Sequence, residues 1–272
     1  ELFSNGFVVL PNVLTREEIA SLRATVQKHL RSAGRCNYGG KFQLYALYEA
    51  ENVARLMTSD KVLSHLKKLT QPLDVVLTGE CDLMINTTSS WHTDVPHHTA
   101  SSDGSLFSDE SFRVYKIAFY LQDQPEDART TLKVRPGSHL KGRYRSFPEK
   151  GLAVKAGDAI IFDVRIEQAG QMPTLVDKAL RRLVNWCVPL LRRDPQELFT
   201  WARTVIRKLT GMPDRVAVFM TFGPAEPWTY SYAEVGRARH PGVRGALSAD
   251  ALDQLVRNNV GPPLIGQPAA AH

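Results

Sequence analysis

The sequence of residues 115–121, Tyr-Lys-Ile-Ala-Phe-Tyr-Leu, sets the expected fold class. Its aromatic and β-branched residues are typical of a short, buried β-strand. Similar runs lie on both sides, separated by Gly, Pro, Asn and Asp residues: 74–78, 81–85, 131–134, 158–162, 183–188 and 215–222. Short strands at this spacing predict an antiparallel sandwich or barrel.

Helical patterns precede and follow the strands. Thr15-Arg-Glu-Glu18 has the form of a capping box, and apolar residues then recur at the helical period as far as Leu30. Further helical segments are expected at 51–69, 195–209 and 249–257. We therefore expect a single domain over residues 1–260 and a loosely ordered tail over 261–272. Within the domain we expect a helical N-terminal support over 1–72, a β core over 73–190, and a helix-and-strand extension over 191–260.

Composition narrows the possible partners. The 272 residues carry a net charge of +6 and 43% apolar residues, and no nucleic-acid-binding motif accompanies the positive charge. No apolar run approaches the roughly 18 residues of a membrane helix, and three scattered cysteines do not form a disulfide framework. We expect a cytoplasmic protein with a small-molecule substrate and neither nucleic acid nor membrane as a partner; the oligomeric state is left open.

The segment Trp91-His92-Thr93-Asp94 is the first candidate for chemistry. Residues two apart on an extended chain point to the same side, so the imidazole of His92 and the carboxylate of Asp94 can bind one metal ion. This spacing also arises by chance. The alternative is a turn in which the aspartate only hydrogen-bonds the histidine.

Between Leu10 and Pro189 the chain resembles the phytanoyl-CoA dioxygenase family of Fe(II)- and 2-oxoglutarate-dependent oxygenases. The matching pieces occur in the family's order: the Gly6-Phe-Val-Val-Leu-Pro11 start with its capped helix, residues 91–94, residues 115–121, Leu132-Lys-Val-Arg-Pro-Gly-Ser-His139, Gly157-Asp-Ala-Ile-Ile-Phe-Asp163, and an arginine-bearing strand near 181. The resemblance implies a mainly β protein with flanking helices, a double-stranded β-helix of the jelly-roll or cupin-like kind. It also implies Fe(II) as cofactor, with 2-oxoglutarate and O2 as co-substrates.

The resemblance implies that His92, Asp94 and a distal histidine are the metal ligands. The run Asp163-Val-Arg-Ile-Glu-Gln168-Ala-Gly170 aligns with the distal motif and places Gln168 where the family has its second histidine. A neutral amide oxygen is a poorer Fe(II) ligand than an imidazole nitrogen. Three interpretations of Gln168 are open. It is a natural variant in an enzyme that still turns over, it is an engineered substitution, or it belongs to a relative that has given up oxygen chemistry.

The far carboxylate of 2-oxoglutarate requires a cationic side chain, and arginine binds a carboxylate in a bidentate manner. The family's spacing places this arginine at the start of the expected strand 183–188. Alternation puts Arg181 on the smaller, more polar face and Arg182 on the bulkier one, so we favour Arg181 over Arg182. Lys116 corresponds to a family position that contacts the co-substrate, but it could equally be a solvated strand lysine.

Two functions follow from the resemblance. The first is an Fe(II)/2-oxoglutarate-dependent oxygenase that hydroxylates or otherwise oxidises a C–H bond of a small molecule, with His92 and Asp94 as catalytic residues. The alternative is a catalytically lapsed family member that acts as a small-molecule-binding protein or a non-oxidative enzyme.

Overall fold

Two antiparallel sheets form the centre of the protein. The computed structural model describes residues 1–95, 109–141, 147–191, 193–240 and 245–265. The larger sheet has seven strands. In spatial order they are β1 (Phe7–Leu10), β8 (Ala159–Asp163), β5 (Tyr115–Tyr120), β10 (Val216–Pro224), β4 (Val75–Ile85), β3 (Gly40–Gln43) and β2 (Arg35–Asn37). The smaller sheet has the order β7 (Lys150–Gly151), β6 (Lys133–Val134), β9 (Gln168–Ala169).

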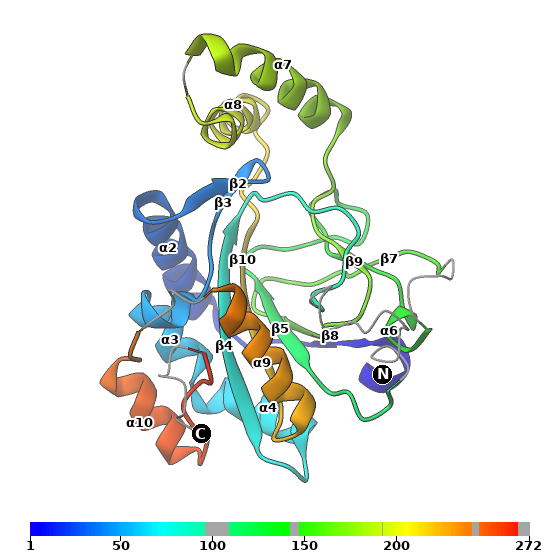
Figure 1. Ribbon diagram of the computed structural model, residues 1–272, viewed down its shortest axis with the longest axis vertical. Helices are drawn as coiled ribbons and strands as arrows, with labels where there is room; N and C mark the ends of the chain where they lie inside the picture. Colours follow the sequence, from blue (N-terminus) through cyan, green and yellow to red (C-terminus); the bar gives the residue numbers. More distant parts are fainter. Residues whose placement is uncertain (96–108, 142–146, 192, 241–244, 266–272) are drawn as a thin grey trace.

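Helices cover the outer face of the large sheet (Figure 1). They are α2 (Arg16–Ser32), α3 (Glu51–Met57), α4 (Asp60–Thr70) and α10 (Ala249–Arg257). Their apolar faces share one core with alternate residues of the sheet, including Leu77 and Val218. The predicted capping box of α2 is present: the Thr15 hydroxyl accepts a hydrogen bond from the backbone N–H of Glu18, and the Glu18 carboxylate accepts one from that of Thr15. The outer face of the large sheet is therefore part of the hydrophobic core.

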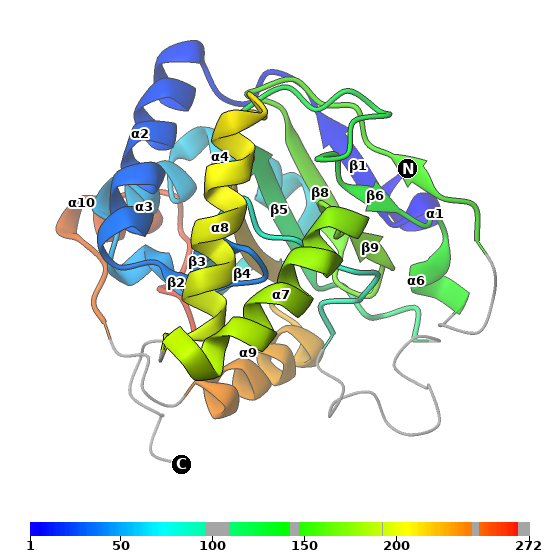
Figure 2. The same ribbon diagram turned by 90° about the horizontal axis from the view of Figure 1, so that it is seen from above.

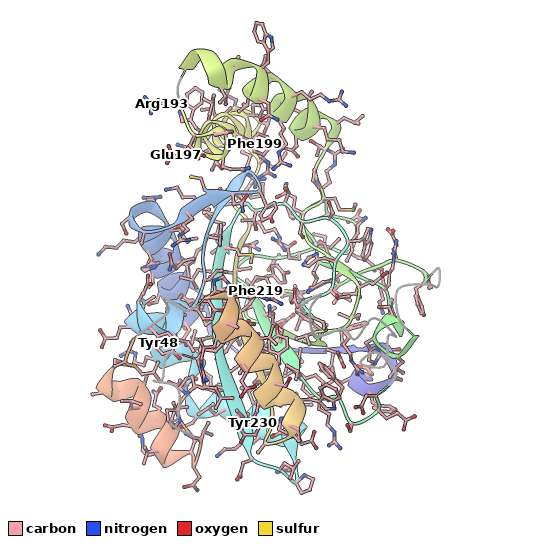
Figure 3. The ribbon with its side chains drawn as sticks, viewed as in Figure 1. Tyr48, Arg193, Glu197, Phe199, Phe219 and Tyr230 are labelled. Atoms are coloured by element: carbon pink, nitrogen blue, oxygen red, sulfur yellow. The ribbon has the colours of Figure 1, made fainter. Side chains whose placement is uncertain are left out.

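The other residues of the same strands face the small sheet. On β10 these include Ala217 and Phe219, the latter labelled near the middle of Figure 3, and Tyr120 lies on the same side of β5. They pack with Val134 of β6 in a second core. Because strand residues alternate between faces, this second core is the interior of a jelly-roll barrel. The predicted fold class, a mainly β jelly-roll barrel with flanking helices, is confirmed.

The two strands expected at 74–78 and 81–85 are a single strand, β4. Its pairing with β10 shifts register between Met220 and Phe222, and the strand bends at Gly79, whose φ is 96°. A side chain at Gly79 would meet the backbone of Ile265 at 2.8 Å. The glycine that looked like a strand boundary in the sequence is therefore the site of a β-bulge.

The strand expected at 183–188 is wrong: these residues lie within the helix α7 (Leu175–Leu191), which packs on α8 (Pro195–Leu209). The run is apolar enough for either structure, but Val184 is buried while Leu183 and Trp186 are exposed, as in a helix packed on one side. The two helices form an excursion between β9 and β10 at one end of the molecule (Figures 1 and 2). The β core therefore continues to residue 224, beyond the expected end at 190.

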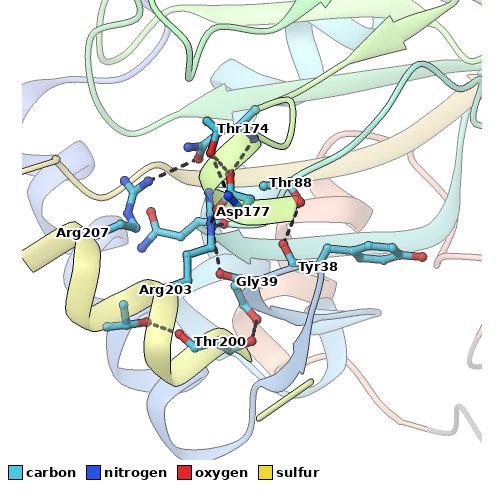
Figure 4. A network of polar contacts seen from close by, with 12 residues as sticks. Tyr38, Gly39, Thr88, Thr174, Asp177, Thr200, Arg203 and Arg207 are labelled. Atoms are coloured by element: carbon cyan, nitrogen blue, oxygen red, sulfur yellow. Dashed lines mark hydrogen bonds and ion pairs between the residues drawn. The ribbon is translucent and has the colours of Figure 1, made fainter. Parts of the chain in front are cut away.

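A buried ion pair fixes this excursion to the barrel (Figure 4). Nε of Arg203 on α8 lies 2.8 Å from the Asp177 carboxylate on α7. The same guanidinium donates to the backbone carbonyl groups of Gly39 and Asn86. Because both charged groups are buried and hydrogen-bonded, α7, α8 and the β2–β3 end of the large sheet are held together.

The remaining elements are α1 (Leu2–Asn5), η1 (Ala46–Tyr48), α6 (Ser138–Lys141) and α9 (Pro227–Arg239). Part of the expected loose tail is ordered, because Ile265 is buried and its N–H donates to the carbonyl of Thr78; residues 266–272 lie outside the described residues. None of the described helices is long and apolar enough to cross a membrane.

Candidate active site

Two backbone hydrogen bonds join His92 to Gln168. Each N–H donates to the other residue's carbonyl oxygen at 2.9 Å, and the N–H of Asp94 donates to the carbonyl of Val164 at 2.9 Å. In an antiparallel pair, residues that exchange both hydrogen bonds have side chains on the same face. Asp94, two residues after His92, shares that face. The backbone therefore directs all three side chains to one place.

The side chains of these residues meet. Nε2 of His92 lies 3.5 Å from Oδ1 of Asp94, and Nε2 of Gln168 donates to Oδ2 of Asp94 at 2.9 Å. Gln168 is only 5% exposed, which places it in the barrel wall with its amide directed inward. The structure thus brings the three predicted metal ligands together, and their role as ligands stays a prediction.

The imidazole of His92 is oriented by a local contact. Its Nδ1 lies 2.7 Å from the carbonyl oxygen of Ser90, which fits a tautomer in which Nδ1 carries the proton and donates. Nε2, on the Asp94 side, then has a lone pair in the neutral ring and holds the second proton, facing the Asp94 carboxylate, in the imidazolium form. Burial lowers the pKa of His92, but the Asp94 carboxylate and the Ser90 carbonyl outweigh it, and the pKa is raised overall.

Lys116 of β5 lies in the barrel interior beside Asp94. Its Nζ is 3.0 Å from Oδ2 of Asp94, and only 8% of the residue is exposed. Burial alone would lower the pKa of Lys116, but Asp94, Asp82 and Glu80 raise it above its usual range. The Lys116 ammonium and the imidazole of His92 in turn hold the pKa of the buried Asp94 well below its usual range. The solvated-lysine alternative for Lys116 is therefore wrong.

Two further carboxylates line the wall formed by β4. Burial raises the pKa of Asp82 to about 7, with Glu80 and Asp94 adding to the effect and Lys116 opposing it. The Glu80 carboxylate accepts hydrogen bonds from the hydroxyl groups of Thr221 and Tyr232 at 3.2 and 3.1 Å. Tyr232 belongs to α9, and its hydroxyl also lies 3.4 Å from the Asp94 carbonyl. This helix therefore covers the side of the site next to β4.

Arg181 and Arg182 do not reach the site. Both lie on the exposed surface of α7, where Arg181 stacks over Phe199 of α8 at 5.4 Å. Their expected position rested on a strand that is a helix. The spacing of a dozen residues after Gln168 fails because α7 and α8 intervene before the next strand of the barrel.

Arg215, which directly precedes β10, is a buried arginine of the barrel interior. It is 4% exposed, and alternation along β10 puts it on the inner face with Ala217 and Phe219. Its Nη2 lies 3.0 Å from the Tyr120 hydroxyl and its Nε donates to the Thr130 carbonyl, while no described carboxylate pairs with it. A Cβ at Gly170 would lie 3.0 Å from Nη2, so the arginine lies beside the strand of Gln168. The alternation of residues 215–222 could have identified it from the sequence.

The donor set can be tested against a divalent iron ion. The acceptor nitrogen of His92, a carboxylate oxygen of Asp94 and the amide oxygen of Gln168 would be its protein ligands, once the Gln168 amide turns its oxygen toward Asp94. No group of three His, Cys, Asp or Glu side chains within the described ranges offers an alternative. One imidazole and two oxygen ligands fit a divalent ion, with lower affinity for iron than two imidazoles and a carboxylate.

Comparison with protein-family models assigns the chain. The model of the family described as "Phytanoyl-CoA dioxygenase (PhyH)" matches residues 3–170, more than half of the chain. The chain therefore belongs to the phytanoyl-CoA dioxygenase family, whose members are non-haem iron, 2-oxoglutarate-dependent oxygenases and related enzymes. Its membership supports a function of the oxygenase type. A search of curated proteins finds no match.

Solved structures share the fold. The 2-oxoglutarate-dependent epimerase SnoN from nogalamycin biosynthesis is 16% identical with a TM-score of 0.55, covering 82% of this chain and 80% of its own. HygX from Streptomyces hygroscopicus, solved with nickel, 2-oxoglutarate and hygromycin B, is 14% identical with a TM-score of 0.55, covering 82% and 85%. The non-haem monooxygenase ThoJ with nickel is 18% identical with a TM-score of 0.51, covering 82% and 75%. At these identities the likeness concerns the fold.

Proposed function

We propose that this protein is an Fe(II)/2-oxoglutarate-dependent oxygenase that oxidises a C–H bond of a small molecule, with Gln168 as its third protein ligand. The observation that carries the proposal is the convergence of His92, Asp94 and Gln168 in the same barrel interior as Arg215. A bound iron ion supplies the redox chemistry that uses O2 and 2-oxoglutarate. The SnoN and HygX structures contain small-molecule compounds, which supports a substrate of that class.

Several polar residues of the interior have roles in this proposal. His92, Asp94 and Gln168 hold the metal, and the Ser90 carbonyl keeps the acceptor nitrogen of His92 turned toward it. Arg215, with the Tyr120 hydroxyl beside it, binds the far carboxylate of 2-oxoglutarate through charge-assisted hydrogen bonds. Lys116 holds the Asp94 carboxylate in position. Tyr232 of α9 limits access of water from the β4 side.

The second candidate is a lapsed member that binds a small molecule without oxidising it. The observation that favours it is the contact between Gln168 and Asp94. The Gln168 amide N–H donates a hydrogen bond to the carboxylate that would have to bind the metal. A small molecule would then bind in the barrel interior without turnover.

Release of succinate from 2-oxoglutarate distinguishes the two candidates. The parent protein with Fe(II), 2-oxoglutarate and air should release succinate above the rate of the protein without metal. Gln168→His should raise the rate, because it supplies an imidazole at that position, and Asp94→Ala should abolish it. If neither the parent nor Gln168→His exceeds the metal-free control, the lapsed-member function takes its place.

A further inference from the structure

The third ligand of the proposed site differs from imidazole in more than its strength. A side-chain amide binds a metal through a neutral oxygen, whereas a histidine at this position would bind through nitrogen. Imidazole ligands suit Fe, Ni, Cu and Zn, whereas carboxylate, carbonyl and water oxygens suit Mg, Ca and Mn. Gln168 therefore affects the choice of metal as well as the affinity.

We infer that Gln168, compared with a histidine at the same position, shifts the metal preference of this site toward Mn(II) and away from Fe(II) and Co(II), which favour imidazole ligands. The inference rests on the proposed function, because it takes His92, Asp94 and Gln168 as the ligands. With Gln168 two of the three protein ligand atoms are oxygens, whereas with histidine two would be nitrogens. The affinity of a site for divalent ions rises from Mn(II) to Co(II) and Ni(II), and it rises more steeply where the ligands are nitrogens. An oxygen ligand in place of a nitrogen therefore makes the differences in affinity between these ions smaller.

The backbone holds the Gln168 side chain at the proposed metal site. Its two hydrogen bonds to His92 fix its position in the strand, and with 5% exposure the side chain points into the interior beside Asp94. The remaining imidazoles of the described chain have other positions. His139 contacts the Phe3 carbonyl, His240 packs on Tyr45, and His29 and His65 lie on the outer helices α2 and α4.

Lys116 allows the Gln168 amide to change its orientation. In the structure, Oδ2 of Asp94 accepts hydrogen bonds from both Gln168 and Lys116, at 2.9 and 3.0 Å. When the amide turns its oxygen toward a metal, Oδ2 keeps the ammonium as its partner. The loss of one hydrogen bond lowers the affinity for every ion equally, so it does not alter the order among ions.

Metal binding without co-substrate tests the inference independently of turnover. Under anaerobic conditions, the dissociation constants of Mn(II), Co(II) and Fe(II) are measured for the parent and for Gln168→His, by the loss of the free Mn(II) EPR signal and by competition with it. Gln168→His should tighten Co(II) and Fe(II) by roughly tenfold or more, since even outer-shell changes have effects of that size. Mn(II) should tighten much less, so the ratio of the Mn(II) to the Co(II) dissociation constant should rise.

Three further variants make each outcome informative. Gln168→Glu keeps an oxygen ligand and should tighten Mn(II) without raising that ratio; it also serves if Gln168→His does not fold, as judged by circular dichroism. Gln27→His adds an imidazole on α2, away from the site, and should change nothing. Equal tightening of all three ions by Gln168→His would overturn the inference, and so would a Gln168→Ala variant that binds metals like the parent. If the parent binds Mn(II), Co(II) and Fe(II) with similar dissociation constants but releases no succinate, the inference is sustained and the oxygenase function is rejected.

Discussion

The ammonium group of Lys116 lies 3.0 Å from Oδ2 of Asp94, and both side chains are largely buried in the barrel interior. Removing one partner of a buried ion pair leaves an uncompensated charge, which costs about 3–5 kcal/mol. Lys116→Met should lower the free energy of unfolding by about this amount, measured by urea denaturation at pH 7. Lys116→Met/Asp94→Asn should be more stable than Lys116→Met alone, because it removes both charges. Additive losses would contradict the pairing.

The same pair has a defined pH window. The pKa of Asp94 is lowered from 3.8, so its contribution to stability is present above pH 3.8 and lost as pH falls through the folded-state pKa. The pKa of Lys116 is raised from 10.5, so its contribution is present below pH 10.5 and lost as pH rises through the folded-state pKa. Lys116 also opposes the raised pKa of Asp82, so Lys116→Met should raise that pKa further. The stability difference between the parent and Lys116→Met should therefore grow as pH rises above about 7, and denaturation at several pH values checks this.

Asp82 should make the protein less stable as pH rises from about 4 to 7. Burial raises its pKa from 3.8 to about 7, so in this interval the folded protein keeps a proton that the unfolded chain has lost. Asp82→Asn should remove this slope and raise the free energy of unfolding at pH 8 by about 2–4 kcal/mol. The exposed Asp74→Asn is the matched control and should leave the slope unchanged. If the Asp82→Asn variant still loses stability between pH 4 and 7, Asp82 is not the origin of the slope.

Arg215 should determine the affinity for 2-oxoglutarate. Arg215→Met removes a charge-assisted hydrogen bond worth about 1.5–3 kcal/mol, which corresponds to a roughly 10- to 100-fold weaker binding. Isothermal titration of 2-oxoglutarate in the presence of Mn(II) measures it. Arg181→Met and Arg182→Met are controls on the exposed helix α7 and should bind like the parent. A larger effect at Arg181 than at Arg215 would return the co-substrate site to the position expected from the sequence.

The ion pair of Arg203 and Asp177 should stabilise the α7–α8 excursion. Arg203→Met leaves Asp177 buried without its cation and removes two hydrogen bonds to backbone carbonyl groups, so we expect a loss of about 3 kcal/mol. Amide hydrogen exchange should show faster exchange across α7 and α8. Arg181→Ala, which removes only the stacking on Phe199, should cost less than about 1 kcal/mol. Equal effects of the two changes would be inconsistent with the buried pair.

Local patterns predicted much of this structure. The strand at 115–121, the capped helix from Thr15 and the helices at 195–209 and 249–257 follow from periodicity and capping, which depend on neighbouring residues. The meeting of His92 and Asp94 followed from their spacing on an extended chain. Gln168 was placed by the order of the family's motifs, because its partner residue lies 76 positions earlier in the chain.

The misplaced strand and the misplaced arginine share one physical cause. Residues 183–188 are apolar at a spacing that fits a strand or a helix, and only packing against α8 decides between them. Once these residues were taken as a barrel strand, Arg181 was expected in the barrel interior, where the structure instead has Arg215. The roles of Asp82 and Glu80 depend on contacts with Lys116 and Tyr232 from distant strands and helices, for which the sequence carries no local signal.

The strand order has a consequence for synthesis of the protein. β10 is the last of the described strands to leave the ribosome, yet it lies in the middle of the large sheet, between β5 and β4. Until residue 224 has emerged, the nascent chain holds two half-sheets, β1-β8-β5 and β4-β3-β2, with an unpaired edge on each. A chain that stops at residue 170 would keep those edges exposed and be prone to aggregate, so folding of the barrel must wait until β10 has been synthesised.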